Sequence, residues 1–129
     1  MRTKLETALA ALVFILPSTT AYAATPQEMV GIVRSKAEAA VEERLRDPQS
    51  VNFYNVTAYR MRAGSNVPTA VCGEFNAKNG FGGYHGREPF VWIAFDETLH
   101  VDFDHGTAFL GSEVYTRKML VLCKFPISE

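Results

Sequence analysis

The fold is decided at residues 41–53, VEERLRDPQSVNF, where the spacing of apolar residues changes from helical to strand-like. Before this stretch, apolar residues recur every three or four positions, which indicates an amphipathic helix. After it, they alternate with polar residues, which indicates a half-buried strand. Asp47 stands before Pro48, and a residue in that position avoids the backbone angles of a helix. The helix is therefore expected to end here.

The helix is predicted to run from about residue 26 to residue 46. Thr25 is a suitable N-cap, Pro26 occupies the first turn, where its missing N–H is not needed, and Glu28 completes a capping box. One apolar stripe is formed by Met29, Val33, Ala37, Ala40, Val41 and Leu45. Most charged residues fall on the other side, so one face of the helix is expected to be buried.

About five short strands are predicted after the helix. They span residues 50–62, 69–75, 90–95, 99–103 and 119–125, and residues 113–118 are either a helical turn or an extended lead-in. In the first strand, Val51, Phe53, Thr57, Tyr59 and Met61 alternate with mostly polar neighbours. The third is almost continuously apolar and contains Trp92, which indicates a central strand buried on both faces. The sequence therefore predicts an α+β domain, with the helix on one face of an antiparallel sheet of four to six strands.

The first 23 residues have the features of a signal peptide. Arg2 and Lys4 give a positive start, residues 8–16 are an uninterrupted apolar core, and Ala21 and Ala23 suit positions −3 and −1 of a cleavage site. That core is far shorter than the roughly 20 residues of a membrane-spanning helix. We therefore expect cleavage after Ala23, a single globular domain over residues 24–129, and a protein that is periplasmic or secreted without stable membrane insertion.

Charge and composition exclude two kinds of partner. The chain has 13 basic and 14 acidic residues, and the leader removes Arg2, Lys4 and Glu6, so 11 basic and 13 acidic residues remain, a net charge of about −2. A nucleic-acid-binding domain normally has a basic face, and the sequence pattern shows none. The predicted helix carries charges of both signs, unlike a membrane-binding basic helix.

Two cysteines remain after the leader is removed, Cys72 and Cys123. An even number of cysteines in a small exported domain favours a disulfide. A closed loop of about 50 residues would stabilise the fold by roughly 4 kcal/mol in the chain-entropy model. The alternatives are two buried free thiols or a pair of metal ligands. We expect the disulfide, because neither cysteine lies in a cluster of ligands.

The stretch with the strongest functional signal is residues 76–87, NAKNGFGGYHGR. Four glycines among twelve residues allow tight turns, and aromatic and cationic residues between them are typical of a recognition surface. The candidate binding residues are Asn76, Lys78, Asn79, Tyr84, His85 and Arg87, with Tyr84 and Arg87 as anchors. One alternative is a long hairpin connection whose Phe81 and Tyr84 fold back onto the core. Another is a phosphate cradle, although the glycine spacing fits neither a Walker loop nor a dinucleotide fingerprint.

Two segments carry a resemblance to a family. Residues 45–53 read LRDPQSVNF, residues 71–84 read VCGEFNAKNGFGGY, and Pro89 and Phe90 follow. Over residues 40 to 95 this pattern resembles small exported bacterial proteins of uncharacterised function. The resemblance implies a bacterial origin and a common fold, and it implies no activity.

A second constellation lies further along the chain. His100, Asp102 and Asp104 share one face of a predicted strand and His105 follows directly, a set that suits zinc or manganese. The same pattern is also what a solvated strand face produces. A predicted bend at residues 96–98 places His100 near Ala94 or Phe95, at the end of the sheet remote from the loop. We therefore expect His85 and His100 not to share a cleft.

Catalytic patterns are weak by comparison. No serine lies in a nucleophile elbow, both cysteines are expected to be bonded, and Glu74 with His85 is the one acid–base pair that flanks the loop. The favoured interpretation is an exported non-enzymatic protein without a cofactor, which binds a protein or glycan partner in the envelope or outside the cell. The alternative is a small metal-binding protein or metal-dependent enzyme that uses His100, Asp102 and His105.

Overall fold

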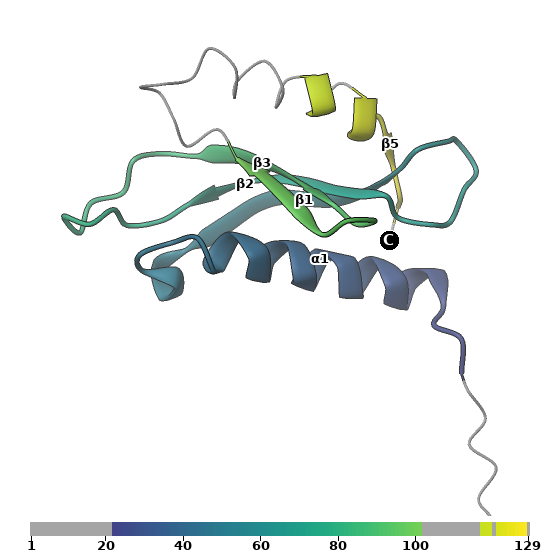
Figure 1. Cartoon of the computed structure of the whole chain (residues 1–129), viewed down its shortest axis with the longest axis horizontal. Helices are drawn as coiled ribbons and strands as arrows, with labels where there is room; N and C mark the ends of the chain where they lie inside the picture. The colour runs from purple at the N-terminus through teal and green to yellow at the C-terminus, as the bar shows by residue number, and fades with distance from the viewer. Residues whose placement is uncertain (1–21, 102–116, 120, 129) are drawn as a thin grey trace, which may run out of the picture.

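The structure is a computed structural model that describes residues 22–101, 117–119 and 121–128. One helix, one short 3-10 turn and five strands follow one another: α1 (Pro26–Glu42), η1 (Pro48–Ser50), β1 (Asn52–Arg60), β2 (Ala70–Asn76), β3 (Glu88–Ile93), β4 (Thr98–Val101) and β5 (Phe125–Pro126). The strands form one sheet in the order β4-β3-β2-β1-β5, and every pairing is antiparallel. Helix α1 covers one face of this sheet, and residues near the C-terminus lie over the other (Figure 1). The predicted α+β fold is confirmed.

Helix α1 begins as its sequence predicts and ends earlier. The backbone N–H of Glu28 donates to Thr25 Oγ1 at 3.2 Å, and the N–H of Thr25 donates to Glu28 Oε2 at 2.7 Å, so the capping box is complete. The helix ends at Glu42, and two further turn hydrogen bonds, from the N–H groups of Arg44 and Leu45, lead out of it. The predicted end near residue 46 is therefore about one turn too late. Leu45 still packs against the core, although it lies outside the helix.

Strand β1 contains one more residue than the segment of β2 opposite it, and this extra residue forms a β-bulge. Tyr54 pairs with Glu74, but the next pair is Thr57 with Cys72. Asn55, inside the bulge, has a φ of +52°. A bulge reverses which side chains face the core, because strand side chains alternate between the two faces.

The predicted alternation in the first strand is therefore wrong beyond the bulge. Phe53, Val56 and Ala58 all pack in the cluster beneath the helix, whereas Tyr59 packs on the opposite face of the sheet. The bulge also brings β1 close to β2. A Cβ on Gly73 would lie 3.0 Å from Val56 Cα and 3.1 Å from Phe90 Cε1, so a side chain there would push β1 or the Phe90 ring away by a few tenths of an ångström.

The main core lies between α1 and the sheet. Trp92 and Phe75 are each 2% exposed and Phe90 is fully buried. The ring of Phe90 lies 6.2 Å from those of Phe53 and Phe75, in edge-on and tilted geometries that favour aromatic contact. The prediction that this third strand is central and buried on both faces is confirmed, since Phe90 to Ile93 are all buried.

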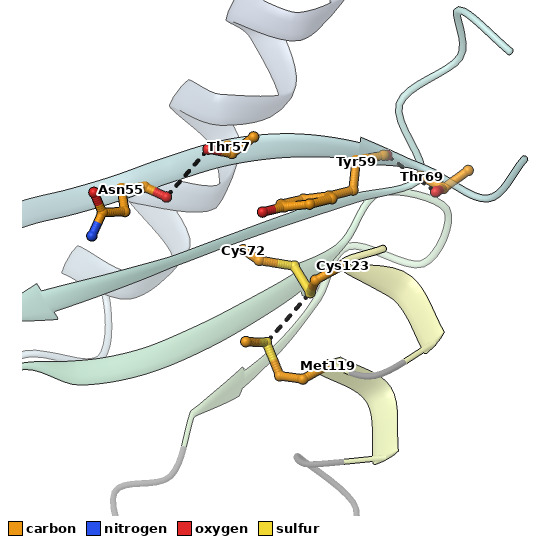
Figure 2. The surroundings of a disulfide bond; sticks show 7 residues. All are labelled: Asn55, Thr57, Tyr59, Thr69, Cys72, Met119 and Cys123. Atoms are coloured by element: carbon orange, nitrogen blue, oxygen red, sulfur yellow. Dashed lines mark hydrogen bonds between the residues drawn. A yellow bond between two sulfur atoms is a disulfide. The ribbon is translucent and has the colours of Figure 1, made fainter. Parts of the chain in front are cut away.

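A second, smaller cluster lies on the opposite face, around the disulfide (Figure 2). Cys72 on β2 is bonded to Cys123, as predicted, and Met119 Sδ lies 3.3 Å from Cys123 Sγ. The predicted strand over residues 119–125 is wrong. Residues 117–119 and 121–122 are helical, and the N–H of Cys123 donates to the carbonyl of Met119. This turn places Met119, Leu122 and Cys123 together over the sheet, which a strand would not do.

The hairpin between β3 and β4 differs from prediction in its register. Ile93 pairs with Thr98 around a turn at residues 94–97, in which Glu97 has a φ of +55°. His100 therefore pairs with Val91, and the predicted position near Ala94 or Phe95 is wrong. The bend begins two residues earlier than expected, and Asp96 Oδ1 closes it by accepting hydrogen bonds from the N–H and hydroxyl of Thr98.

The bulge yields a stability prediction. Gly73→Ala should lower the free energy of unfolding by about 2 kcal/mol, because its Cβ meets backbone and ring atoms that have little room to move. Gly31→Ala is the control, since nothing lies within 4 Å of its Cβ and it sits on the exposed side of α1. That control should raise the free energy by about 0.5–1 kcal/mol. Urea unfolding monitored by Trp92 fluorescence measures both, and equal stability of the two variants would contradict the proposed close packing.

Candidate functional site

The glycine-rich loop, residues 76–87, connects β2 to β3. It projects from one end of the sheet, next to the turn that follows α1 (Figure 1). The opposite end of the sheet carries the β1–β2 and β3–β4 turns, because adjacent strands run antiparallel. All the residues of the loop from Gly80 to Arg87 are exposed.

Asn79 shapes the tip of the loop. Its side-chain Oδ1 accepts hydrogen bonds from the N–H groups of Phe81 at 2.9 Å and Gly83 at 3.1 Å. Its own N–H donates to the carbonyl of Gly83 at 2.8 Å, and its Nδ2 lies 2.8 Å from His85 Nε2. Gly82 has a φ of +82°, which a residue with a side chain rarely adopts. Asn79 therefore supports the turn from within.

Ser50 ties the loop to the end of the helix region. Its hydroxyl accepts a hydrogen bond from the N–H of Lys78 at 2.9 Å and donates to the carbonyl of Asp47 at 2.8 Å. Its carbonyl accepts a hydrogen bond from the hydroxyl of Tyr84 at 3.0 Å. Lys78 and Tyr84 also pair across the base of the loop tip. Tyr84, predicted as an anchor for a partner, therefore also anchors the loop to η1.

Arg87 lies over the strands at the base of the loop. Its guanidinium carbon is 3.9 Å from the centre of the Tyr54 ring, and its Nη1 is 3.8 Å from Glu74 Oε2. Asn55 Nδ2 donates to the same carboxylate oxygen. Nearby, Asn76 Oδ1 accepts a hydrogen bond from the N–H of Gly86 at 3.3 Å. Arg87 is thus held in a defined orientation while about half of its side chain remains exposed.

Phe81 is the residue that sequence reasoning missed as a binding candidate. Its side chain is 100% exposed at the tip of the loop, whereas Tyr84 is 49% exposed. The alternative in which Phe81 folds back onto the core is therefore wrong. Its position between Gly80 and Gly82 was the available signal, because a turn this tight keeps a side chain at its tip away from the sheet.

A pocket of about 400 Å³ opens between the loop and the chain segment that follows α1. Its described lining residues are Arg44, Leu45, Arg46, Phe75, Ala77, Lys78, Asn79, Gly80, His85, Gly86 and Glu88. Three of them carry a full positive charge, and Glu88 is the one acidic residue among them. His85 lines this pocket, and His100 is not among its described lining residues.

His100 lies on β4, where its side chain meets the C-terminal helical residues. Its Nε2 is 2.7 Å from Lys118 Nζ, so the ammonium donates and the imidazole accepts. Burial lowers the pKa of His100 below its ordinary value of 6.5, and the charge of Lys118 lowers it further. Both effects favour the neutral imidazole.

The metal-binding alternative rests mostly on residues outside the described part of the chain. Asp102 and His105 lie outside the described residues, and Lys118 already occupies the Nε2 of His100. Within residues 22–101, 117–119 and 121–128, no three histidine, cysteine, aspartate or glutamate side chains lie close enough to hold a metal ion.

The chain has no significant match among protein-family models, curated proteins or solved structures. The function is therefore argued from the residues of this chain and their contacts.

The role of Asn79 can be tested by amide hydrogen exchange. Asn79→Ala removes the acceptor of two loop hydrogen bonds, so exchange at Phe81 and Gly83 should accelerate about tenfold, with little change in the core strands. Lys78→Ala is the control, because the bond from its backbone N–H to Ser50 does not need the side chain. Unchanged exchange in Asn79→Ala would show that the side chain does not shape the turn.

His100 yields a prediction of pH dependence. Its lowered pKa means that the unfolded chain binds a proton more readily than the folded one. The folded state therefore has its full stability, as far as His100 is concerned, above about pH 6.5, where the imidazole is neutral in both states. This stability is lost as the pH falls through the lower pKa that His100 has in the folded state. His100→Asn cannot titrate, so its free energy of unfolding should fall less between pH 8 and pH 5. Equal losses in urea titrations of both proteins would contradict this.

Proposed function

We propose that this chain is an exported, non-enzymatic binding protein that recognises a partner in the envelope or outside the cell through the glycine-rich loop. The observation that carries the proposal is Phe81, a fully exposed aromatic side chain at the tip of a loop held by its own hydrogen bonds. Binding residues are often placed on loops held by a rigid scaffold, and aromatic side chains are among the usual anchors of protein interfaces.

The order of the loop favours binding over a simple connection. Binding loses affinity when a flexible loop must be ordered, so a loop already held in one shape keeps more of its contact energy. Asn79 fixes the tip and Ser50 fixes the base, before any partner is present. Aromatic and arginine side chains dominate the energetics of protein interfaces, and this one loop carries three that are exposed, Phe81, Tyr84 and Arg87.

The contacts of the polar residues also favour binding over catalysis. Glu74 interacts with Asn55 and Arg87, and His85 interacts with Asn79. Each member of the suggested acid–base pair is thus engaged with a different partner. A general acid and base would instead need to converge on one reacting group.

Two features support an exported location. The disulfide between Cys72 and Cys123 is typical of oxidising compartments. The leader expected over residues 1–23 supplies a route to the periplasm or beyond, although its first 21 residues lie outside the described structure. No helix in the described part of the chain is long and apolar enough to cross a bilayer.

Affinity capture tests the proposed role of the loop. The full chain, with its own leader and an affinity tag, is exported in a bacterial host and used to capture partners from envelope and culture fractions. Phe81→Ala should weaken capture of a specific partner by about 30-fold, the loss expected for an interface hot spot.

Phe95→Ala is the matched control. Phe95 is 88% exposed, but it lies in the β3–β4 turn at the other end of the sheet. It should retain the partner at wild-type levels. Equal capture by the Phe81 and Phe95 variants would contradict binding through the loop, as would full retention by a Tyr84→Ala, Arg87→Ala double variant.

A further inference from the structure

We propose that the pocket beside the loop takes an acidic peptide segment of the partner that carries an apolar side chain. The carboxylates would meet Arg44, Arg46 and Lys78, and the apolar side chain would rest on the floor of the pocket. This inference rests on the proposed function, because residues of the glycine-rich loop form one wall of the pocket, among them Gly80, the chain neighbour of Phe81.

The positive charges in the pocket are concentrated and available. Arg44 and Arg46 are exposed on either side of Leu45, and the ion pairs found among the described residues, Lys36 with Glu97 and Arg87 with Glu74, do not involve them. Arg46 lies against the loop itself, since its Nη1 would be 2.7 Å from a Cβ on Gly80. The chain as a whole is slightly acidic, so this basic pocket is a local feature and not a reflection of overall composition.

The floor of the pocket is apolar. Leu45 and Ala77 are partly exposed at the edge of the core, and Phe75 beneath them is almost completely buried. A pocket of about 400 Å³ falls within the range of known ligand sites, which are mostly apolar with a few polar groups that fix orientation. Guanidinium groups above an apolar floor suit a ligand that presents both carboxylates and a hydrocarbon side chain.

These features favour a peptide over an anionic glycan. A uronic acid oligomer would supply carboxylates but no hydrocarbon side chain to bury against Leu45 and Ala77. Phe81, fully exposed and adjacent in the chain to the lining residue Gly80, offers a further apolar contact that a partner protein would bury more completely than a sugar chain.

The test is a nuclear magnetic resonance titration of the isotopically labelled protein with the peptide acetyl-Asp-Glu-Leu-Glu-Asp-amide. Saturable shifts should appear at the backbone amides of Leu45, Ala77 and Lys78. The matched basic peptide, acetyl-Lys-Lys-Leu-Lys-Lys-amide, should cause none. Trigalacturonic acid is titrated in parallel as the anionic glycan.

Two double variants then test whether the positive charges of the pocket bind the acidic peptide. Arg44→Gln with Arg46→Gln should weaken the acidic peptide about fivefold or more, as two partly exposed ion pairs predict. Arg62→Gln with Lys124→Gln removes the same net charge from exposed positions outside the pocket lining and should change the affinity less than twofold. Unfolding curves of both double variants confirm that they are folded.

Several outcomes would overturn the inference: the absence of saturable shifts, equal weakening by both double variants, or tighter binding of trigalacturonic acid than of the peptide. The capture assay separates this failure from failure of the proposed function. If Phe81→Ala loses the partner and Arg44→Gln with Arg46→Gln keeps it, the loop binds but the acidic-segment inference is wrong. If both variants keep the partner, both proposals fail.

Discussion

The hydrogen bonds of Ser50 connect the chain segment after α1 to the glycine-rich loop, and the pocket lies between these two. Ser50 ends the turn that Pro48 begins, and its hydroxyl and carbonyl hold Lys78 and Tyr84 of the loop. Pro48, which begins this turn six residues after α1 ends, thereby sets the position of the residue that docks the loop. A shift of this turn would displace the loop, the pocket beside it and the arginines that precede it.

The extra residue in β1 shapes the sheet next to the base of the glycine-rich loop. The bulge at Asn55 turns Val56 toward the helix and leaves Tyr54 and Glu74 paired on the other face, where Arg87 interacts with both. Gly73 permits the close approach of the strands at that point. On the same face, Met119, Leu122 and Cys123 pack against the cluster around the disulfide.

The sequence predicted the parts of the fold that depend on local patterns. The capping box, most of the helix stripe, the buried third strand and the disulfide follow from residue type and spacing, although Val30 is in the core where Met29 was predicted. The bulge was not predicted: Asn tolerates a positive φ better than most residues, but the register shift at Asn55 depends on how β1 pairs with β2. The C-terminal strand was wrong because residues 119–123, MLVLC, are all apolar and so fit either period, and contact with the sheet decides between them. The sequence singled out the loop, but not the contacts that hold it: Tyr84 bonds Ser50, 34 residues earlier, and Asn79 bonds the turn around Phe81 and Gly83.

The most direct measurement is nitrogen-15 relaxation of the backbone amides in the glycine-rich loop of the free protein. A loop held by Asn79 and Ser50 in advance of binding should be as rigid as the sheet, with order parameters of about 0.85 for Phe81 and Gly83. Values below about 0.6 at these residues would show a flexible glycine-rich connection instead, and would contradict the view that Phe81 is displayed by a preformed turn.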